Sequence, residues 1–425
     1  MKPERFTAGM FVIVIAGMMS LCVMSVGFRL NEKVKDDDLR FKVDTVDWEE
    51  LYPFADGRTH TEHSVMKSVM DYVKSRIEDY TSASIVGYNK IVEVERMYES
   101  LMCWNMVSAS DYNAVVKLKD GYLTAYTMSL NVAPDAESVK EFADFCEGKG
   151  ASFLYVNIPT KICASEDRDI SGVLDFANQN ADRFLAMLRE SGVKYYDLRE
   201  ALHAAGMGHH ASFFRTDHHW KPETGLWAAG KVLEILRDDL GFETEPEILR
   251  PENFRYEVYH DWFLGSQGKK VTLARTTPDD FTMIYPKFAT RLRFEIPSIG
   301  LDVSGDFRVT YDMVAVSTKD YYGKNPYGAY IYADQPLIRI VNNDSANSKK
   351  ILIIHESMSN CVVPFVVLGV RELWLTDLRH FTGSVRNFVE TVRPDAVIVM
   401  YYATVPGRAA DPSASPEAKK FYDFR

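Results

Sequence analysis

Asp217 and His219 stand two positions apart in the segment FFRTDHHWKP, and their side chains are of the types that perform acid–base chemistry. In an extended chain the side chains of residues i and i+2 project to the same side, so this carboxylate and this imidazole can meet. A catalytic carboxylate holds an imidazole in one tautomer while the other ring nitrogen takes a proton from a hydroxyl nucleophile. Asp217 and His219 are therefore candidates for the orienting group and the general base.

A serine nucleophile would complete this set, and Ser357 is the leading candidate. It closely follows the apolar run ILII and precedes a segment of helical character, so its hydroxyl would stand on a tight turn. Backbone amides of residues 357–359 would then be placed to stabilise an oxyanion. Ser359 is the weaker candidate, because it stands two residues further on and could instead cap a helix that begins near residue 360.

Both features also have structural explanations. A serine after a strand often caps a helix, and a His-His pair beside Trp220 often serves packing and hydrogen bonding. His209 and His210 precede this pair with the spacing HH-x7-HH, which matches no established ligand pattern. We therefore expect no metal ion and no other cofactor.

Short apolar runs recur from about residue 150 onward and alternate with helical patterns. They are typical of parallel strands buried on both faces, so the sequence predicts an α/β fold with a doubly wound parallel sheet. The expected strands cover residues 152–158, 351–354, 372–375 and 396–400, and the expected helices cover residues 136–147, 172–190, 222–238 and 383–392. Ligands of such sheets bind beyond the carboxyl ends of the strands. The polar residues that follow the expected strands include Lys161, Ser357, Arg379 and Tyr401.

Residues 241–345 differ from this pattern. They are rich in Pro, Tyr and Phe and contain the alternating segments RLRFEI, FRVTYDMVAV and YGAYIYA, which predict a β-rich insertion. Residues 31–110 combine a charged stretch with an amphipathic one and predict a stalk and a helical region. We therefore divide the chain into a leader and membrane anchor at 1–30, the stalk region at 31–110, and an α/β domain at 111–425.

The N-terminal anchor is predicted from residues 6–28, which are 23 residues without one Asp, Glu, Lys or Arg. As a helix they would extend about 35 Å, enough to cross a bilayer. Lys2 and Arg5 precede them, so the positive-inside rule predicts a single pass with a cytoplasmic N-terminus and an extracytoplasmic domain in the cell membrane. A cleaved signal peptide is an alternative, although the run is long and ends in the poor cleavage sequence VMSVG. A buried helix of a soluble domain is a third reading.

The composition and charge of the chain bear on its class of protein and on its partners. The 425 residues carry 49 Lys and Arg against 60 Asp and Glu, a net charge of -11, so the charge does not favour a nucleic-acid partner. A content of 46% hydrophobic and 26% charged residues is typical of a folded protein. The five cysteines are widely spaced without a C-x-x-C pair, and they fit small buried hydrophobic residues as well as disulfides.

The string TDHHW and its surroundings resemble the signature of the DHHW protein family, which is similar to the alginate O-acetyltransferases of the AlgX and AlgJ type. Other segments resemble that family in order and approximate spacing, so the likeness covers most of residues 110–402. They are VNIPTK, WFLGSQGKKV, TPDDF, ILIIHESMSN, LTDLRHF and RPDAVIVMYY. The resemblance implies an SGNH hydrolase-like fold of three α/β/α layers. It also implies that Asp217 orients, His219 acts as the base and Ser357 is the nucleophile.

One departure concerns the serine block, which reads Gly-Asp-Ser in the family and His355-Glu356-Ser357 here. A bulky His where Gly allows close backbone approach could disturb the oxyanion site and make the chain slow, altered in specificity or inactive. On the resemblance, Arg379 would contact the substrate or the oxyanion, with a salt bridge to a neighbouring acid as the alternative. The other residues expected to bind substrate are Lys161, His218, Trp220 and Tyr401.

These features together predict a membrane-anchored, extracytoplasmic O-acyltransferase or esterase that acts on acetyl groups of a cell-surface polysaccharide. The resemblance implies a membrane-bound O-acyltransferase partner that supplies the acyl group, because an extracytoplasmic domain has no direct access to acetyl-CoA. A catalytically inactive subunit that binds glycan or assists assembly is the main alternative. A metal-dependent hydrolase is the third.

Overall fold

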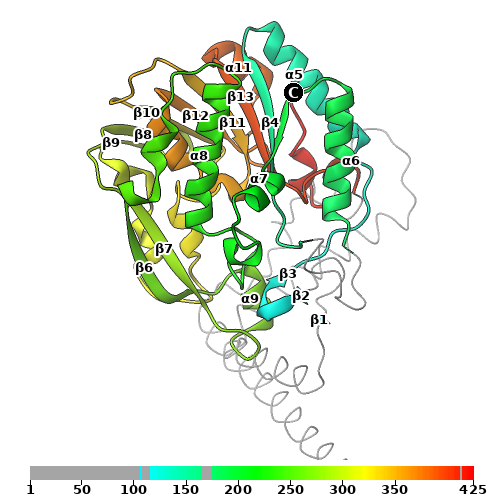
Figure 1. Ribbon diagram of the computed structural model, residues 1–425, viewed down its shortest axis with the longest axis vertical. Helices are drawn as coiled ribbons and strands as arrows, with labels where there is room; N and C mark the ends of the chain where they lie inside the picture. Colours follow the sequence, from blue (N-terminus) through cyan, green and yellow to red (C-terminus); the bar gives the residue numbers. More distant parts are fainter. Residues whose placement is uncertain (1–105, 108–114, 164–174, 412–413) are drawn as a thin grey trace, which may run out of the picture. The chain divides into compact units, whose positions relative to one another are not determined.

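The computed structural model describes residues 106–107, 115–163, 175–411 and 414–425 (Figure 1). They belong to one compact unit, Glu99–Arg425. Its centre is a sheet of eight strands, of which five neighbouring strands run parallel. In order across the sheet, the parallel strands are β5 (Tyr195–Asp197), β4 (Ser152–Ile158), β13 (Ala396–Tyr402), β11 (Lys350–His355) and β12 (Glu372–Thr376).

The central parallel strands are buried on both faces, as their apolar sequences predict. Every residue of β13 is buried, and so is every residue of β4 except the first. Buried backbone groups need hydrogen-bond partners, and β13 finds them in β4 on one side and in β11 on the other. The predicted α/β fold with a mostly parallel sheet is therefore confirmed, and the carboxyl ends of β4, β11, β12 and β13 meet at one edge.

Helices cover both faces of this sheet. They are α5 (Ala133–Gly148), α6 (Ala177–Glu190), α7 (Leu198–Ala204), α8 (Pro222–Asp238), α10 (Val363–Val366) and α11 (Val385–Val392). A further short helix, α9 (Ser266–Val271), contacts the strands at residues 115–117 and 123–124 instead. Crossovers between parallel strands are almost always right-handed. The crossovers through α6 and α11 step in one direction across the sheet and the crossover through α10 steps in the other, so α10 lies on the opposite face. α8 contacts α10 and passes in front of the strands in Figure 1.

The predicted β-rich insertion extends the central sheet. Its strands β8 (Leu292–Ile296), β9 (Leu301–Gly305) and β10 (Leu337–Asn342) continue the sheet beyond β12, each antiparallel to its neighbour. The other two strands of this region, β6 (Phe254–Phe263) and β7 (Asp279–Pro286), form a separate two-stranded sheet. The insertion therefore extends the central sheet by three strands and adds a separate antiparallel pair of strands.

Two segments of the insertion that were expected to alternate as strands form 3-10 turns instead. Residues 307–316 contain the turns Phe307–Thr310 and Met313–Val316, and residues 327–333 begin within the turn Pro326–Ala329. The carboxylates of Asp306 and Asp312 cap the first two turns by accepting backbone N–H groups two residues further on. Such local side-chain caps compete with strand pairing, which is why the alternation is misleading here.

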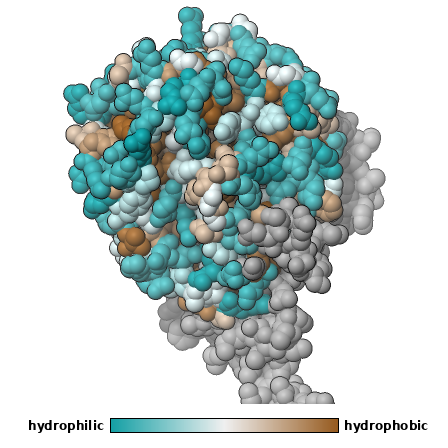
Figure 2. All heavy atoms as spheres, in the orientation of Figure 1, coloured by the Kyte–Doolittle hydropathy of each residue, from teal (hydrophilic) through white to brown (hydrophobic). Residues whose placement is uncertain are grey.

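A small third sheet consists of β1 (Met106–Val107), β2 (Val115–Lys117) and β3 (Leu123–Thr124). The predicted anchor at 6–28, nearly all of the stalk region and its boundary at 110 lie outside the described residues and stay predictions. Within the described ranges no helix is long and apolar enough to cross a membrane. The face in Figure 2 is mostly hydrophilic, with hydrophobic residues scattered over it.

Gly225 marks a close approach between α8 and the turn that carries Ser357. A Cβ atom at this position would lie 2.5 Å from the carbonyl oxygen of Cys361 and 2.6 Å from its sulfur. We predict that Gly225→Ala lowers the free energy of unfolding by about 1–3 kcal/mol, because buried backbone has to move. Urea denaturation of the purified chain measures this change.

Gly230→Ala in the same helix is the matched control. Nothing among the described residues lies within 4 Å of the Cβ that it would add. Ala has the higher helix propensity, so we expect this variant to gain up to about 1 kcal/mol. Equal free energies of unfolding for the two variants would contradict the close approach at Gly225.

Candidate active site

The predicted Asp/His pair lies in a short loop that directly precedes α8. An antiparallel bridge between Phe213 and Trp220 closes this loop, and the backbone N–H of Phe214 donates to the carbonyl oxygen of His219 at 3.0 Å. Pro222 occupies the first turn of α8, where its fixed φ suits the start of a helix. The loop is therefore held between its own bridge and a buried helix.

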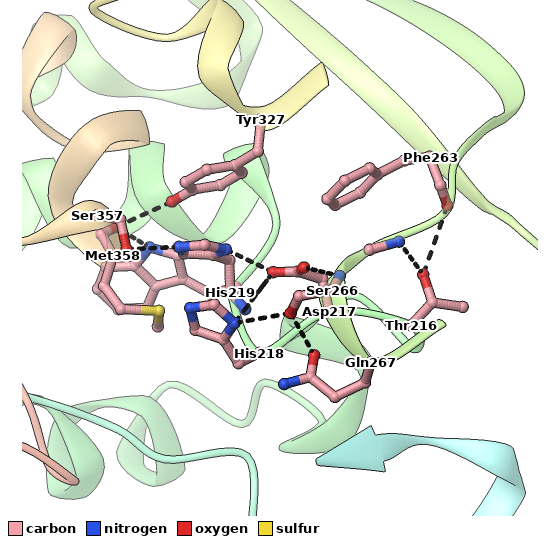
Figure 3. Close-up of polar contacts among 12 residues, drawn as sticks. Thr216, Asp217, His218, His219, Phe263, Ser266, Gln267, Tyr327, Ser357 and Met358 are labelled. Atoms are coloured by element: carbon pink, nitrogen blue, oxygen red, sulfur yellow. Dashed lines mark hydrogen bonds and ion pairs between the residues drawn. The ribbon is translucent and has the colours of Figure 1, made fainter. Parts of the chain in front are cut away.

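Asp217 is only 3% exposed, and both oxygens of its carboxylate accept hydrogen bonds. Oδ1 accepts the backbone N–H of His219 at 3.0 Å and the ring Nδ1–H at 2.5 Å, while Oδ2 accepts the backbone N–H of Ser266 at 2.6 Å (Figure 3). Burial alone would raise the pKa of this carboxyl group. The neighbouring His218 and His219 and these hydrogen bonds outweigh that effect and hold the pKa of Asp217 well below its usual range. Asp217 is therefore an ionised carboxylate that fixes the imidazole.

The Ser266 amide reaches Asp217 because the preceding residue has no side chain. A Cβ atom at Gly265 would collide with the Cβ and Oδ2 atoms of Asp217. Gly268 makes a second close approach, since a Cβ there would lie 2.7 Å from the Cβ of Thr216. Gly265 has an ordinary φ of -71°, so contact between two chain segments explains the glycine, and no special backbone angle is involved.

His219 connects the carboxylate to the candidate nucleophile. A carboxylate can only accept hydrogen bonds, so the ring proton lies on Nδ1 and Nε2 is left as an acceptor. The Oγ of Ser357 lies 2.8 Å from this Nε2, within reach for proton transfer. The imidazole lies between two rings (Figure 3): it stacks on Tyr327 at a centroid distance of 3.9 Å, and the ring of His218 lies 3.8 Å away at a tilt of 37°. Asp217, His219 and Ser357 thus have the geometry of a Ser/His/Asp triad.

Ser357 begins a 3-10 turn, Ser357–Cys361, that follows β11. The residue that caps this turn is Glu356, whose carboxylate accepts the backbone N–H of Met358 at 3.0 Å. The capping role that offered a structural explanation for Ser357 is therefore performed by its neighbour. Ser359, the weaker nucleophile candidate, is fully buried.

The backbone amides beside Ser357 match the predicted oxyanion site only in part. The N–H of Met358 is taken by Glu356, and the N–H of Ser359 donates to the carbonyl oxygen of Glu356 at 2.9 Å. Within the described part of the chain the N–H of Ser357 itself has no acceptor. It is therefore the one amide of the predicted group left for an oxyanion.

His355 and Glu356, which replace the Gly-Asp of the family block, are both buried. Burial raises the pKa of Glu356 to about 7, although the Met358 amide and the charge of Arg379 act in the opposite direction. Burial also lowers the pKa of His355. Both shifts favour the neutral form, which is the form that costs least free energy in a core. The hydrogen bond from Ser357 to the imidazole is present despite this replacement.

Three of the residues expected to bind substrate are buried parts of the framework instead, namely Lys161, Trp220 and Tyr401. The Lys161 ammonium donates to the carbonyl oxygens of Leu123, at 2.7 Å, and of Asp217. The Trp220 indole donates to the carbonyl oxygen of Met358 at 2.7 Å, and the Tyr401 hydroxyl donates to that of Phe421 at 2.7 Å. Tyr401 lies within β13, whereas the expected strand 396–400 had placed it beyond the end, and no local sequence pattern shows that the side chains of Lys161 and Trp220 turn inward.

Arg379 and His218 keep partly exposed side chains, 20% and 34% exposed. The guanidinium binds the carboxylate of Asp377 through Nε and Nη2, and Nη2 also bonds Asp334 at 2.8 Å, so the predicted salt bridge is present. Its Nη1 makes no hydrogen bond within the residues that the structure describes. His218 Nδ1 lies 3.3 Å from the Oγ of Ser266. These two remain candidates for contact with a substrate.

Two residues that hold the site, Asp279 and Tyr327, were not among the site residues expected from the sequence. Asp279 accepts the backbone N–H groups of Arg215 and Thr216 at 2.9 and 2.8 Å and the Thr216 hydroxyl at 2.6 Å. Tyr327 packs on the imidazole and donates to the carbonyl oxygen of Met358 at 3.1 Å. Asp279 belongs to the TPDDF segment, so a signal for it existed, whereas nothing in the sequence around Tyr327 marks that residue.

Three groups of described residues bring potential metal-ligand atoms within 4.8 Å of one another. They are Asp217, His218 and His219; Asp334, Asp377 and His380; and Cys163, His203 and His209. The first group is occupied by the hydrogen bonds of the candidate triad, and both carboxylates of the second bind Arg379. The third shares no residue with either.

Comparisons with known proteins support the resemblance. Residues 119–255 match the family model described as ALGX, SGNH hydrolase-like domain, acetyltransferase AlgX. Bacillus cereus PatB1 with a sulfonyl adduct is 16% identical with a TM-score of 0.59, covering 72% of this chain and 98% of that chain. A DHHW family protein from Eubacterium siraeum DSM 15702 is 17% identical with a TM-score of 0.53, covering 75% and 97%. No curated protein sequence matches the chain.

These comparisons confirm the likeness to the AlgX-type SGNH hydrolase-like domain and the similarity of the fold to a DHHW family structure. The matched range contains Asp217 and His219 but ends before Ser357. Ser357 therefore lies outside the family match, and its hydrogen bond to His219 joins it to the pair.

Glu356 gives a test of the buried serine block through pH. Because its folded pKa is about 7 and its ordinary value is 4.5, the native state binds the proton more tightly than the unfolded chain does. The resulting stability is fully present below the ordinary pKa and is lost as the pH rises through about 7. We predict that wild type loses about 2 kcal/mol more than Glu356→Gln between about pH 5 and about pH 8, measured by urea denaturation.

Glu137→Gln on the exposed face of α5 is the control for this comparison. This substitution removes a carboxylate of the same type without changing the serine block. The free energy of unfolding of this variant should therefore change with pH as that of wild type does. If Glu356→Gln also followed wild type, Glu356 would not be the buried acid described above.

Proposed function

We propose that this chain is a serine-dependent O-acyltransferase or esterase that acts on acetyl groups of a cell-surface polysaccharide. One observation carries the proposal: the Ser357 hydroxyl, the His219 imidazole and the ionised Asp217 carboxylate are joined by hydrogen bonds of 2.8 and 2.5 Å. A buried carboxylate on one imidazole nitrogen and a serine hydroxyl on the other is the arrangement of acyl transfer.

The reaction would proceed through an acyl-enzyme. Ser357 Oγ attacks the carbonyl carbon of an acetyl ester while His219 Nε2 takes the hydroxyl proton, and Asp217 stabilises the imidazolium that forms. Collapse of the tetrahedral intermediate breaks the bond to the leaving group, which receives the proton from His219. A sugar hydroxyl then attacks the acetyl carbon in a transferase, or water does so in an esterase, while His219 takes the attacking group's proton. The bond between Ser357 Oγ and the acetyl carbon breaks, and His219 returns the proton to Ser357.

Two donors are candidates for stabilising the oxyanion of that intermediate, namely the backbone N–H of Ser357 and the guanidinium of Arg379, whose charge acts on the adjacent Glu356. The Ser357 backbone N–H has no acceptor among the described residues, and the Nη1 of Arg379 is likewise without one there. The remaining nitrogens of Arg379 are fixed by Asp377 and Asp334, so the guanidinium is pre-oriented. Preorganised donors cost no reorganisation during the reaction. They also act most strongly where water is excluded.

The acetyl specificity, the acceptor and the cellular context rest on the family likeness and the sequence. The family model that matches residues 119–255 is described as an acetyltransferase domain. The apolar segment at 6–28 supports an anchor that places the domain outside the cytoplasm. In that location the acyl group would come from a membrane-bound O-acyltransferase partner, and the acceptor would be a polysaccharide at the cell surface.

A second candidate is a catalytically inactive subunit that binds glycan within a modification complex. The observation in its favour is that the Glu356 carboxylate occupies the Met358 amide, which removes one donor from the predicted oxyanion group. Such a subunit would bind polysaccharide equally well as wild type and as Ser357→Ala, and neither would turn over an acetyl ester.

Turnover of a chromogenic acetyl ester by the purified full chain tests the enzymatic proposal. We predict that Ser357→Ala and His219→Ala each lower kcat by about 10³-fold or more, because the two residues act as one unit. For the same reason the double variant should be no slower than either single variant.

Ser359→Ala is the control, since it removes a hydroxyl two residues away, and circular dichroism verifies that each variant is folded. Full turnover by Ser357→Ala would contradict the assignment. A multiplicative loss in the double variant would show that Ser357 and His219 act independently and would contradict the triad.

A further inference from the structure

Cys163, His203 and His209 form a cluster that the proposed reaction does not use. Cys163 lies in the segment that follows β4, His203 lies in the last turn of α7, and His209 directly precedes the turn His210–Ser212. One potential ligand atom of each side chain lies within 4.8 Å of the others. The fold thus brings one thiol and two imidazoles together from two different connections between its strands.

We propose that Cys163, His203 and His209 bind a divalent transition-metal ion, with Zn²⁺ as the best match. One thiolate and two imidazoles are the ligand types that Zn²⁺ prefers, and a water molecule would complete a tetrahedron. At ordinary zinc bond lengths the ligand atoms of a tetrahedral site are about 3.3–3.7 Å apart. The cluster therefore needs only a small inward movement, which the exposed His203 side chain is free to make.

A hydrogen bond outside the cluster prepares His209 for this role. Its Nε2 lies 2.9 Å from the carbonyl oxygen of Thr160. Because a carbonyl can only accept, the ring proton lies on Nε2 and the lone pair lies on Nδ1. Metal-binding histidines typically donate their second ring N–H to a backbone carbonyl in this manner, which fixes the tautomer and the ring orientation.

The burial pattern is that of an ion site with one accessible side. Cys163 is 4% exposed and His209 is 6% exposed, whereas His203 is exposed. The rings of His203 and His209 lie nearly parallel, 19° apart, with centroids separated by 5.6 Å. An ion could therefore enter from the side of His203 and be held by two buried ligands. The thiol would release its proton to solvent when the sulfur–metal bond forms.

Such an ion would clamp the segment that supports the candidate triad. Thr160 and Cys163 flank Lys161, whose ammonium holds the carbonyl oxygen of Asp217. Linking this segment to α7 and to His209 would restrict its movement without placing the metal at the reacting atoms. The ion would therefore act on the segment that supports Asp217, and it would be separate from the chemistry proposed for Ser357.

Cobalt titration of the purified full chain after removal of metals by a chelator tests the proposal, because Co²⁺ bound to thiolate gives a charge-transfer absorption band. We expect one Co²⁺ per chain with this band, displacement by Zn²⁺, and a rise in the unfolding temperature of wild type with either ion. His203→Ala should weaken Co²⁺ binding by more than about 10-fold, a loss that even outer-shell substitutions can cause. Cys163→Ser should abolish the band.

His260→Ala is the matched control for His203→Ala, because His260 is also exposed and lies outside the cluster. It should bind Co²⁺ as wild type does. If Cys163→Ser does not fold, the difference between His203→Ala and His260→Ala decides the matter, since both replace exposed side chains. The proposal is overturned if saturating Co²⁺ gives no thiolate band, if the band persists in Cys163→Ser, or if His203→Ala binds as tightly as His260→Ala.

Discussion

The buried carboxylate of Asp217 is the constraint on which the candidate site depends. An ionised group at 3% exposure is stable only if donors replace the water that it has lost. The imidazole of His219 supplies one donor and the Ser266 amide supplies another, so a second chain segment has to come into contact with the loop. Gly265 permits that contact, because any side chain there would occupy the space of Asp217. The ionised carboxylate of Asp217 therefore requires the close contact that Gly265 permits.

The serine side of the site is built separately and then joined to this carboxylate. β11 delivers Ser357 to the edge of the sheet, and Glu356 caps the turn so that the serine hydroxyl is not needed for that purpose. Trp220 and Tyr327 both donate to the carbonyl oxygen of Met358, which anchors the loop and the turn to each other. The short distance between hydroxyl and imidazole follows from these two contacts and from the packing of α8 at Gly225.

Sequence alone could predict the elements better than the contacts. The apolar runs located the central strands, because parallel strands buried on both faces leave a signal in every residue. The D-x-H spacing and the serine after a strand identified the candidate triad, whose members are neighbours only after folding. Residues 307–316 were misread, since Asp306 and Asp312 cap turns where the hydrophobic alternation favoured strands. The inward direction of Lys161 depends on the Leu123 carbonyl, which lies far away in sequence and leaves no local pattern.

The most direct test of the central claim is to trap and locate the acyl-enzyme. The purified full chain is mixed with an activated acetyl ester, quenched in acid, and digested for mass mapping of the acetyl group. We expect one acetyl group on Ser357, absent from Ser357→Ala and strongly reduced in His219→Ala, because the imidazole has to take the serine proton. An acetyl group on another residue, or ester turnover with no acetylated serine at any time, would contradict the role of Ser357 as the nucleophile.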